Sequence, residues 1–159
     1  MSQYSVLAAR LGNEIITLDK VVKAAQSQAQ KAQAMGDTDF YQAAALSLQN
    51  YYMGAERIFE EIAKQIDQSL PSGANSHQQL LQRMSLDIPQ TRPPLLSPET
   101  LEQLNDYRSF CHVVMHRYGF EFRLDRVQAL VKQLPICHQQ LTQDVENFCE
   151  FLLALDRSI

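Results

Sequence analysis

The sequence predicts an all-α protein: an antiparallel four-helix bundle that forms one domain over residues 1–159. Apolar residues recur every three or four positions over long segments, which is the spacing of one helix face. The 159 residues include only 5 glycines and 6 prolines, the residues that most disfavour helix. Strand-like runs of valine, isoleucine and threonine are missing from the sequence. A chain of this length buries roughly 70% of its unfolded surface, so it needs neither disulfide nor metal for stability.

The first two helices are expected at Gln3–Met35 and Asp39–Leu70. Gly36 ends the first, because glycine readily takes the left-handed conformation that closes a helix. Thr38 is expected to cap the second helix, and Pro71 begins the turn that follows it. Their core-facing residues are Leu7, Leu11, Ile15, Leu18, Val22 and Ala25, followed by Tyr41, Ala45, Leu48, Tyr52, Ala55, Phe59, Ile62 and Ile66.

A short extra helix and a proline-rich loop are expected to connect the second long helix to the next one. The helix should span Ser76–Leu86, and the loop should be an extended segment over Ile88–Pro94. These two segments carry too few apolar residues to build a core of their own. We therefore expect a crossover insert within the bundle and no second domain.

The last two helices complete the predicted bundle. The fourth helix should run from Ser97-Pro98 to about Gly119, with serine as the N-cap and proline in the first turn. The final helix should span Leu124–Arg157, and its apolar face includes His138, which we expect to be a core histidine. The core-facing residues of this helix are Val127, Val131, Leu134, His138, Leu141, Val145, Phe148, Leu152 and Leu155.

Composition limits the possible functions. The formal charge of −4 disfavours general binding to duplex nucleic acid. Cys111, Cys137 and Cys149 are an odd number of cysteines without a disulfide framework, and we expect them to be buried thiols. The N-terminal segment lacks the features of a signal peptide, and no run approaches the roughly 18 apolar residues of a membrane helix. A cytoplasmic protein without a membrane partner is expected.

Polar residues gather on one flank of the fourth predicted helix. At about 100° per residue, Asn105, Arg108, His112 and His116 fall within an arc of about 80°, beside an apolar stripe that includes Cys111. Histidine exchanges protons near neutral pH, and arginine binds phosphate oxygens in a fork. These groups suit phosphodiester transesterification without a metal. A histidine would move the proton of the ribose 2′-hydroxyl or of the leaving oxygen, and arginine would stabilise the phosphorane.

Simpler interpretations of the same residues remain open. His112 and His116 are four residues apart, a spacing that also occurs on ordinary solvated helix surfaces. The two histidines could also ligate a metal, but the sequence offers no identifiable third ligand. We therefore predict neither a metal site nor a cofactor.

The segment from Tyr107 to Asp125, YRSFCHVVMHRYGFEFRLD, resembles the signature of HepT-like proteins in the HEPN superfamily. Those proteins are helical bundles with a motif of arginine, four residues, histidine, one residue and tyrosine. The resemblance implies a metal-independent ribonuclease toxin that forms a homodimer with the motif helices facing each other. It also implies a partner, a nucleotidyltransferase antitoxin that attaches AMP to the motif tyrosine. On this match His116 is the general acid/base, and Tyr118 is the modified residue.

One position departs from the motif. The motif arginine should stand five residues before His116, where this chain has Cys111. A thiol supplies no fixed positive charge, and losing one such donor typically costs about 2.7–4 kcal/mol of transition-state stabilisation. Arg108, one turn earlier, is expected to reach the same phosphate, with His112 assisting. Two functions therefore remain open: a ribonuclease toxin, or a catalytically degenerate HEPN module that binds a nucleotidyltransferase or RNA without cleavage.

Overall fold

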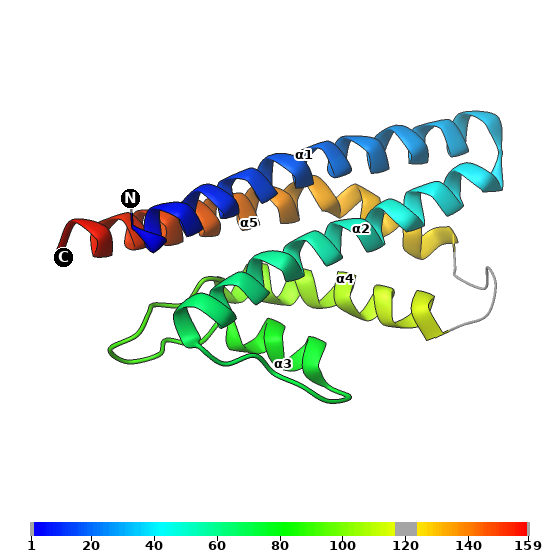
Figure 1. Ribbon diagram of the computed structural model, residues 1–159. Coiled ribbons are helices and arrows are strands. Elements are labelled where there is room, and N and C mark those ends of the chain that lie inside the picture. The colour runs from blue at the N-terminus through cyan, green and yellow to red at the C-terminus, as the bar shows by residue number, and fades with distance from the viewer. Residues whose placement is uncertain (1, 117–123, 159) are drawn as a thin grey trace.

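The computed structural model of the chain describes residues 2–116 and 124–158, except for the side chains of 114–116 (Figure 1). Apart from one isolated bridge, every regular element within these ranges is helical. This confirms the predicted all-α class. The elements are α1 (Gln3–Met35), α2 (Thr38–Ile62), a π-helical turn (Ala63–Asp67), α3 (Ser76–Arg83), α4 (Pro98–His116) and α5 (Leu124–Ser158).

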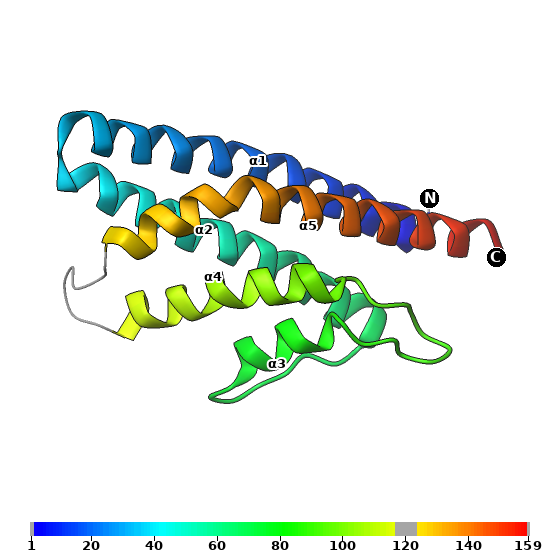
Figure 2. The same ribbon diagram turned by 180° about the vertical axis from the view of Figure 1, so that it is seen from behind.

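Helices α1, α2, α4 and α5 form the predicted antiparallel bundle. Helix α1 packs against α2 and α5, and α4 packs against the same two helices from the opposite side. Chain direction reverses from each long helix to the next along the sequence (Figures 1 and 2). Helix α3 lies outside this bundle, against α2 and α4. The fold is therefore a helical bundle with one additional short helix in the crossover.

The predicted apolar faces form the core. Ile15, Ile66 and Leu155 are half-buried at its edge. The predicted residues that are buried on α1, α2 and α5 are Leu7, Leu11, Leu18, Val22, Ala25, Tyr41, Ala45, Leu48, Tyr52, Ala55, Phe59, Ile62, Val127, Val131, Leu134, His138, Leu141, Val145, Phe148 and Leu152.

The start of α2 differs from the prediction by one residue. Gly36 closes α1 in the left-handed conformation at φ +64°, as expected. The N-cap of α2, however, is Asp37 and not Thr38, because the Asp37 carboxylate accepts a hydrogen bond of 2.9 Å from the Asp39 amide. Thr38 is the first helical residue. A carboxylate at this position also interacts favourably with the positive end of the helix dipole.

The crossover differs more from the prediction. Helix α2 was expected to reach Leu70, but its last π-helical turn ends at Asp67, and Gln68 is left-handed at φ +56°. Helix α3 ends at Arg83 instead of Leu86. The proline-rich segment is not extended throughout, because Gln90 at φ +62° reverses the chain within it.

These differences have one physical reason: the Arg92 side chain is buried. Its Nε and Nη2 atoms donate to the two carboxylate oxygens of Asp67 at 2.6 and 3.0 Å. The remaining N–H groups donate to the carbonyls of Leu86, Pro93 and Arg83 at 3.2–3.3 Å. The guanidinium is 0% exposed, and the bidentate carboxylate pair offsets the loss of its hydration. The chain turns back at both ends of the crossover so that this arginine can enter.

The polar atoms of Tyr51, His138 and Tyr107 lie in the bundle interior, and each has a hydrogen-bond partner. The Tyr51 hydroxyl lies 3.0 Å from Nδ1 of His138, and burial lowers the pKa of that histidine. His138 is thus a core histidine with a hydrogen-bond partner, as predicted. The Tyr107 hydroxyl donates to the Leu130 carbonyl at 2.7 Å, in the turn of α5 that precedes Pro135. Pro135, which has no backbone N–H to donate, follows this turn directly.

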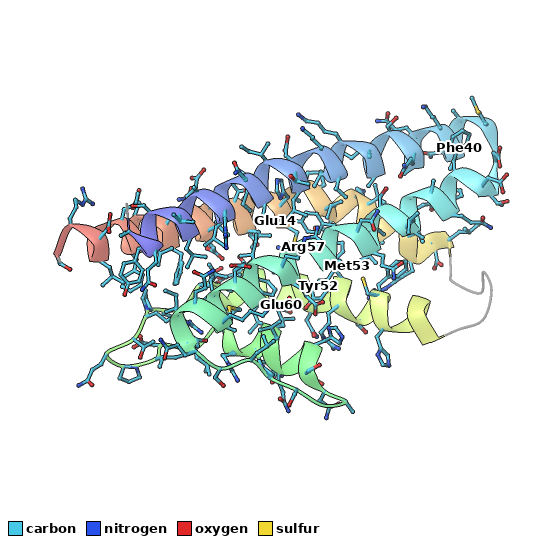
Figure 3. All side chains as sticks on the ribbon, viewed as in Figure 1. Glu14, Phe40, Tyr52, Met53, Arg57 and Glu60 are labelled. Carbon is cyan, nitrogen blue, oxygen red and sulfur yellow. The ribbon has the colours of Figure 1, made fainter. Side chains whose placement is uncertain are left out.

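Helices α1 and α2 approach each other closely at Gly54. A Cβ atom at this position would overlap Cδ2 of Leu18. Close by, the Arg57 guanidinium of α2 pairs with the Glu14 carboxylate of α1 at 3.0 Å (Figure 3). The absence of a side chain at Gly54 therefore sets the distance between the two helices.

The three cysteines carry thiols and form no disulfide; Cys111 and Cys137 are buried, and Cys149 is half-buried. Within residues 2–116 and 124–158, no helix combines the length and the apolar character needed to cross a bilayer.

We expect Arg92→Met to destabilise the protein by about 3–5 kcal/mol in urea unfolding, because it leaves the Asp67 carboxylate buried without its partner. The double variant Arg92→Met/Asp67→Leu should recover most of this loss. Lys23→Met is the matched control, because it removes the exposed Lys23–Asp19 pair and should change stability by at most about 1 kcal/mol. Equal effects of Arg92→Met and Lys23→Met would contradict the anchoring role of Arg92.

Gly54→Ala should lower the free energy of unfolding by about 1–3 kcal/mol, because the added methyl group overlaps Leu18. Gly12→Ala is the control within the same helix pair, since a Cβ there meets nothing within 4 Å. That substitution should stabilise the protein by about 0.5–1 kcal/mol through helix propensity. A Gly54→Ala variant that unfolds at the same urea concentration as wild type would disprove the close contact.

Candidate functional site

A small pocket lies where α2, α3 and α4 meet. Its volume is about 190 Å³. Enclosed sites for drug-sized ligands are typically 300–1,000 Å³, so this pocket accommodates a single small group, such as a phosphate or a ribose. The residues that line it are Gln49, Tyr52, Met53 and Glu56 from α2, His77 from α3, and Arg108, Cys111 and His112 from α4.

The α4 wall of the pocket includes part of the predicted site. Arg108, Cys111 and His112 lie three and four residues apart and face the same pocket. Arg108 is half-buried, and its Nε donates to Oδ1 of Asn105 at 2.9 Å. This bond holds the base of the guanidinium along the helix. Arg108 and His112 are thus brought together, and their side chains can meet one ligand.

Two other predicted site residues fall at the limit of the described chain. His116 is the last residue of α4, and its side chain lies outside the described part. Tyr118 lies entirely outside the described residues. Their roles stay predictions from the sequence motif.

Cys111, at the motif-arginine position, forms part of the pocket floor. The side chain is 6% exposed. Burial raises the pKa of the Cys111 thiol to about 12, and the nearby Glu56 carboxylate adds to this effect. The group is therefore a neutral thiol at physiological pH and contributes neither positive charge nor a reactive thiolate.

The opposite side of the pocket carries a carboxylate–imidazole pair. Oε2 of Glu56 lies 2.7 Å from Nδ1 of His77. The Glu56 side chain is 10% exposed, whereas that of His77 is 66% exposed. Burial raises the pKa of Glu56, and the bond to His77 partly opposes that rise. A buried carboxylate thus holds an imidazole that remains accessible to solvent.

Tyr52, which is labelled on α2 in Figure 3, lines the same pocket as this pair. It is 2% exposed, and its hydroxyl forms no hydrogen bond with any described residue. Burial raises the pKa of the hydroxyl, with the Glu56 carboxylate as the next cause. A buried hydroxyl without a partner is unfavourable by about 1–3 kcal/mol, and a ligand in the pocket can relieve that penalty.

Sequence reasoning missed Glu56 and His77. The one available signal for Glu56 was its position: it is a charged residue directly after Ala55, on the buried side of the predicted second helix. His77 gave no signal, because the crossover brings it to a partner 21 positions earlier in the chain. Helical periodicity describes single elements and cannot predict such a contact.

A larger groove, of about 680 Å³, runs between α1 and α5 and borders His138. That histidine already has Tyr51 as its partner, and its Nε2 lies 3.7 Å from Oδ1 of Asp19. Lys20, Lys23 and Glu146 also line the groove, whereas the predicted site residues Arg108 and His112 do not. The smaller pocket is the better candidate, because Arg108, His77 and Glu56 meet there. Among the described residues, no group of three or more histidine, cysteine or acidic side chains could hold a metal ion.

Comparison with protein families gives one match. The sequence model of a family described as HepT-like protein matches residues 43–152. The matched segment includes every residue that lines the small pocket. No curated protein and no solved structure matches the chain.

The raised pKa of Glu56 predicts a pH-dependent effect of Glu56→Gln on stability. A carboxyl group with a raised pKa in the folded state stabilises the fold below its ordinary value of 4.5 and loses that contribution as pH rises through the folded value. Thermal unfolding should therefore show the melting temperature of Glu56→Gln rising relative to wild type from about pH 4 to pH 7. A Glu56→Gln variant that becomes relatively less stable with rising pH would contradict burial as the dominant cause.

Proposed function

The chain belongs to the HepT-like family, and on this basis we propose that it is a metal-independent endoribonuclease, the toxin of a toxin–antitoxin pair. The observation that carries the proposal is the shared pocket of Arg108 and His112 on α4. It is supported by the motif residues His116 and Tyr118, which continue the same helix and its following segment in sequence.

The proposed reaction is transesterification at a phosphodiester of RNA. The 2′-oxygen attacks phosphorus while a histidine accepts its proton, and the 5′-oxygen leaves with a proton from an acid. His116 is the proposed general acid/base, and His112 assists it. The Arg108 guanidinium stabilises the negative charge that builds on the phosphorane oxygens. The products are a 2′,3′-cyclic phosphate and a 5′-hydroxyl.

Arg108 is the proposed substitute for the missing motif arginine. Its Cα lies one helical turn before Cys111, and both side chains line the same pocket. The bond between Nε and Asn105 leaves both terminal nitrogens of the guanidinium for a phosphate. This geometry supports a nuclease that retains one cation at the site.

A second candidate function is favoured by the buried, neutral thiol of Cys111. Here the chain is a catalytically degenerate HEPN module that binds RNA or a nucleotidyltransferase through the same pocket without cleavage. Loss of one preorganised donor is worth 100–1,000-fold in rate, which would leave little activity if Arg108 did not compensate.

The toxin proposal implies specific partners. A nucleotidyltransferase-type antitoxin would attach AMP to Tyr118, and RNA would be the substrate. Two copies of the chain would form a homodimer with their α4 helices facing each other, in the cytoplasm. Mass spectrometry of the protein after co-expression with such an antitoxin would detect AMP on Tyr118.

We expect the purified protein to cleave a fluorophore–quencher single-stranded RNA of mixed sequence in buffer containing EDTA. Arg108→Ala should slow this cleavage by roughly 100–1,000-fold, because it removes the phosphate cation. His116→Ala should slow it by roughly 100–10,000-fold. Gln78→Ala, an exposed change on α3, serves as the control and should cleave like wild type. A DNA of the same sequence should stay intact, because it lacks the 2′-hydroxyl.

The same assay separates the two candidate functions. RNA binding that depends on Arg108, without cleavage at high protein concentration, would identify the degenerate module. Equal cleavage by wild type, Arg108→Ala and His116→Ala would reject both residue assignments.

Cys111→Arg should raise cleavage by up to 100–1,000-fold, because it restores a fixed charge at the motif position. The new guanidinium would face Glu56, whose carboxylate can partner it within the pocket. Cys111→Ala is the control that removes the thiol without adding charge, and its rate should stay at the wild-type level. If a folded Cys111→Arg protein cleaves no faster than Cys111→Ala, the position does not contribute to catalysis in this chain.

A further inference from the structure

We propose that His77 and Glu56 form a second acid–base unit of this site, in which His77 accepts the proton of the ribose 2′-hydroxyl and Glu56 orients its ring. The inference rests on the proposed function and adds a base from outside the α4 motif. His77 belongs to the crossover helix α3, and Glu56 belongs to α2.

The geometry of the pair is that of an oriented general base. The Glu56 carboxylate accepts from Nδ1 of His77 at 2.7 Å, which fixes the ring and its tautomer. Nε2 is then the ring nitrogen that can exchange a proton with a substrate. The carboxylate is 10% exposed and the imidazole 66% exposed, so the orienting group is buried while the reacting group is accessible. In many enzymes a base that activates a nucleophile is itself oriented by a third group. Here His77 would be the base and Glu56 the orienting group.

Structural stability gives no reason for a carboxylate at position 56. The side chain lies on the buried side of α2, between the core residues Ala55 and Ile58. Burial raises the pKa of Glu56, so keeping it ionised at neutral pH opposes folding. His77 and Arg108 both favour the ionised carboxylate, but burial is the larger effect on its pKa. Perturbed carboxylates of this kind concentrate at functional sites.

The charges around the pair are suited to a phosphate substrate. Glu60 is a nearby acid on α2, and Arg108 is the cation that faces Glu56 from α4. Cys111 and Tyr52 are neutral, because burial raises the pKa of both. An RNA phosphate at Arg108 would therefore fill the pocket of about 190 Å³ and place its adjacent ribose at the rim, beside the exposed imidazole of His77.

The proposed step balances without a cofactor. The O–H bond of the 2′-hydroxyl breaks, its proton passes to Nε2 of His77, and the 2′-oxygen forms a bond to phosphorus. The bond between phosphorus and the 5′-oxygen breaks, and this oxygen takes a proton from a histidine of α4. His77 would thus be the base and the α4 histidine the acid, on opposite walls of one protomer.

The test measures RNA cleavage by wild type, His77→Ala, Glu56→Gln and the control Gln78→Ala, in EDTA and across a range of pH. His77→Ala should be slowed by roughly 100–10,000-fold, and added imidazole should restore part of the rate, because the ring site is exposed. Wild-type cleavage should fall as pH drops through the raised pKa of Glu56. Glu56→Gln should also be slow, because it removes the carboxylate that orients the ring. Melting temperatures measured in parallel report folding.

The outcomes distinguish this inference from the proposed function. Cleavage by His77→Ala at the wild-type rate and with the wild-type pH profile would overturn the inference and leave the nuclease assignment intact. Loss of activity without imidazole rescue, accompanied by a lower melting temperature, would assign His77 a structural role and would also overturn it. A wild-type protein that cleaves no RNA would reject the proposed function, and with it the catalytic role of His77.

Discussion

The buried pair of Arg92 and Asp67 is the interaction on which the non-bundle part of this protein depends. The four long helices bury continuous apolar faces and hold one another, and the crossover adds to the same core the side chains of Leu80, Leu81, Met84, Leu95 and Leu96. Arg92 directs each of its N–H groups to the end of α2, to the end of α3 or to the loop itself. This anchor and the buried side chains of Leu80, Leu81 and Met84 together hold α3 on the bundle. His77 can meet Glu56 only because α3 is held there.

Local periodicity was sufficient to predict the bundle, because each long helix buries one regular stripe. The bounds of α1 and the core position of His138 follow from spacing and capping alone. The end of α2, the reversal at Gln90 and the Glu56–His77 pair depend on contacts between distant segments. Of the predicted site, the sequence identified the α4 wall, with Arg108 and His112 on one face. The α2 and α3 walls could not be predicted, because nothing in a helical repeat shows which polar residues a crossover will bring together.

Cys111 removes one positive charge from the pocket and also changes which groups surround the Glu56 carboxylate. Because the thiol at this position is neutral, two basic side chains act on the Glu56 carboxylate: Arg108 from α4 and His77 from α3. An arginine at position 111 would place a second cation beside the same carboxylate. With cysteine at this position, His77 is the side chain that lies at hydrogen-bond distance from Glu56. Substitution at the motif position and recruitment of a histidine from the insert are physically coupled, because both act through one buried charge.

Tyr52 and Glu56 are two buried polar side chains that meet in one pocket, whereas the side-chain oxygens of Gln103 and Gln140 are buried without a described partner outside it. Tyr51, Tyr107 and Arg92 are buried with partners at ordinary hydrogen-bond distances, so they specify packing without an energetic penalty. Tyr52 and Glu56 lie one turn apart on α2 in the same pocket, and each keeps an unfavourable feature. One has a hydroxyl without a described partner, and the other a carboxylate whose pKa burial raises. A chain selected only to fold would replace both with apolar residues, as it does along the rest of this face. Both side chains line the same pocket as Arg108. Their presence there therefore argues that the pocket binds a polar ligand.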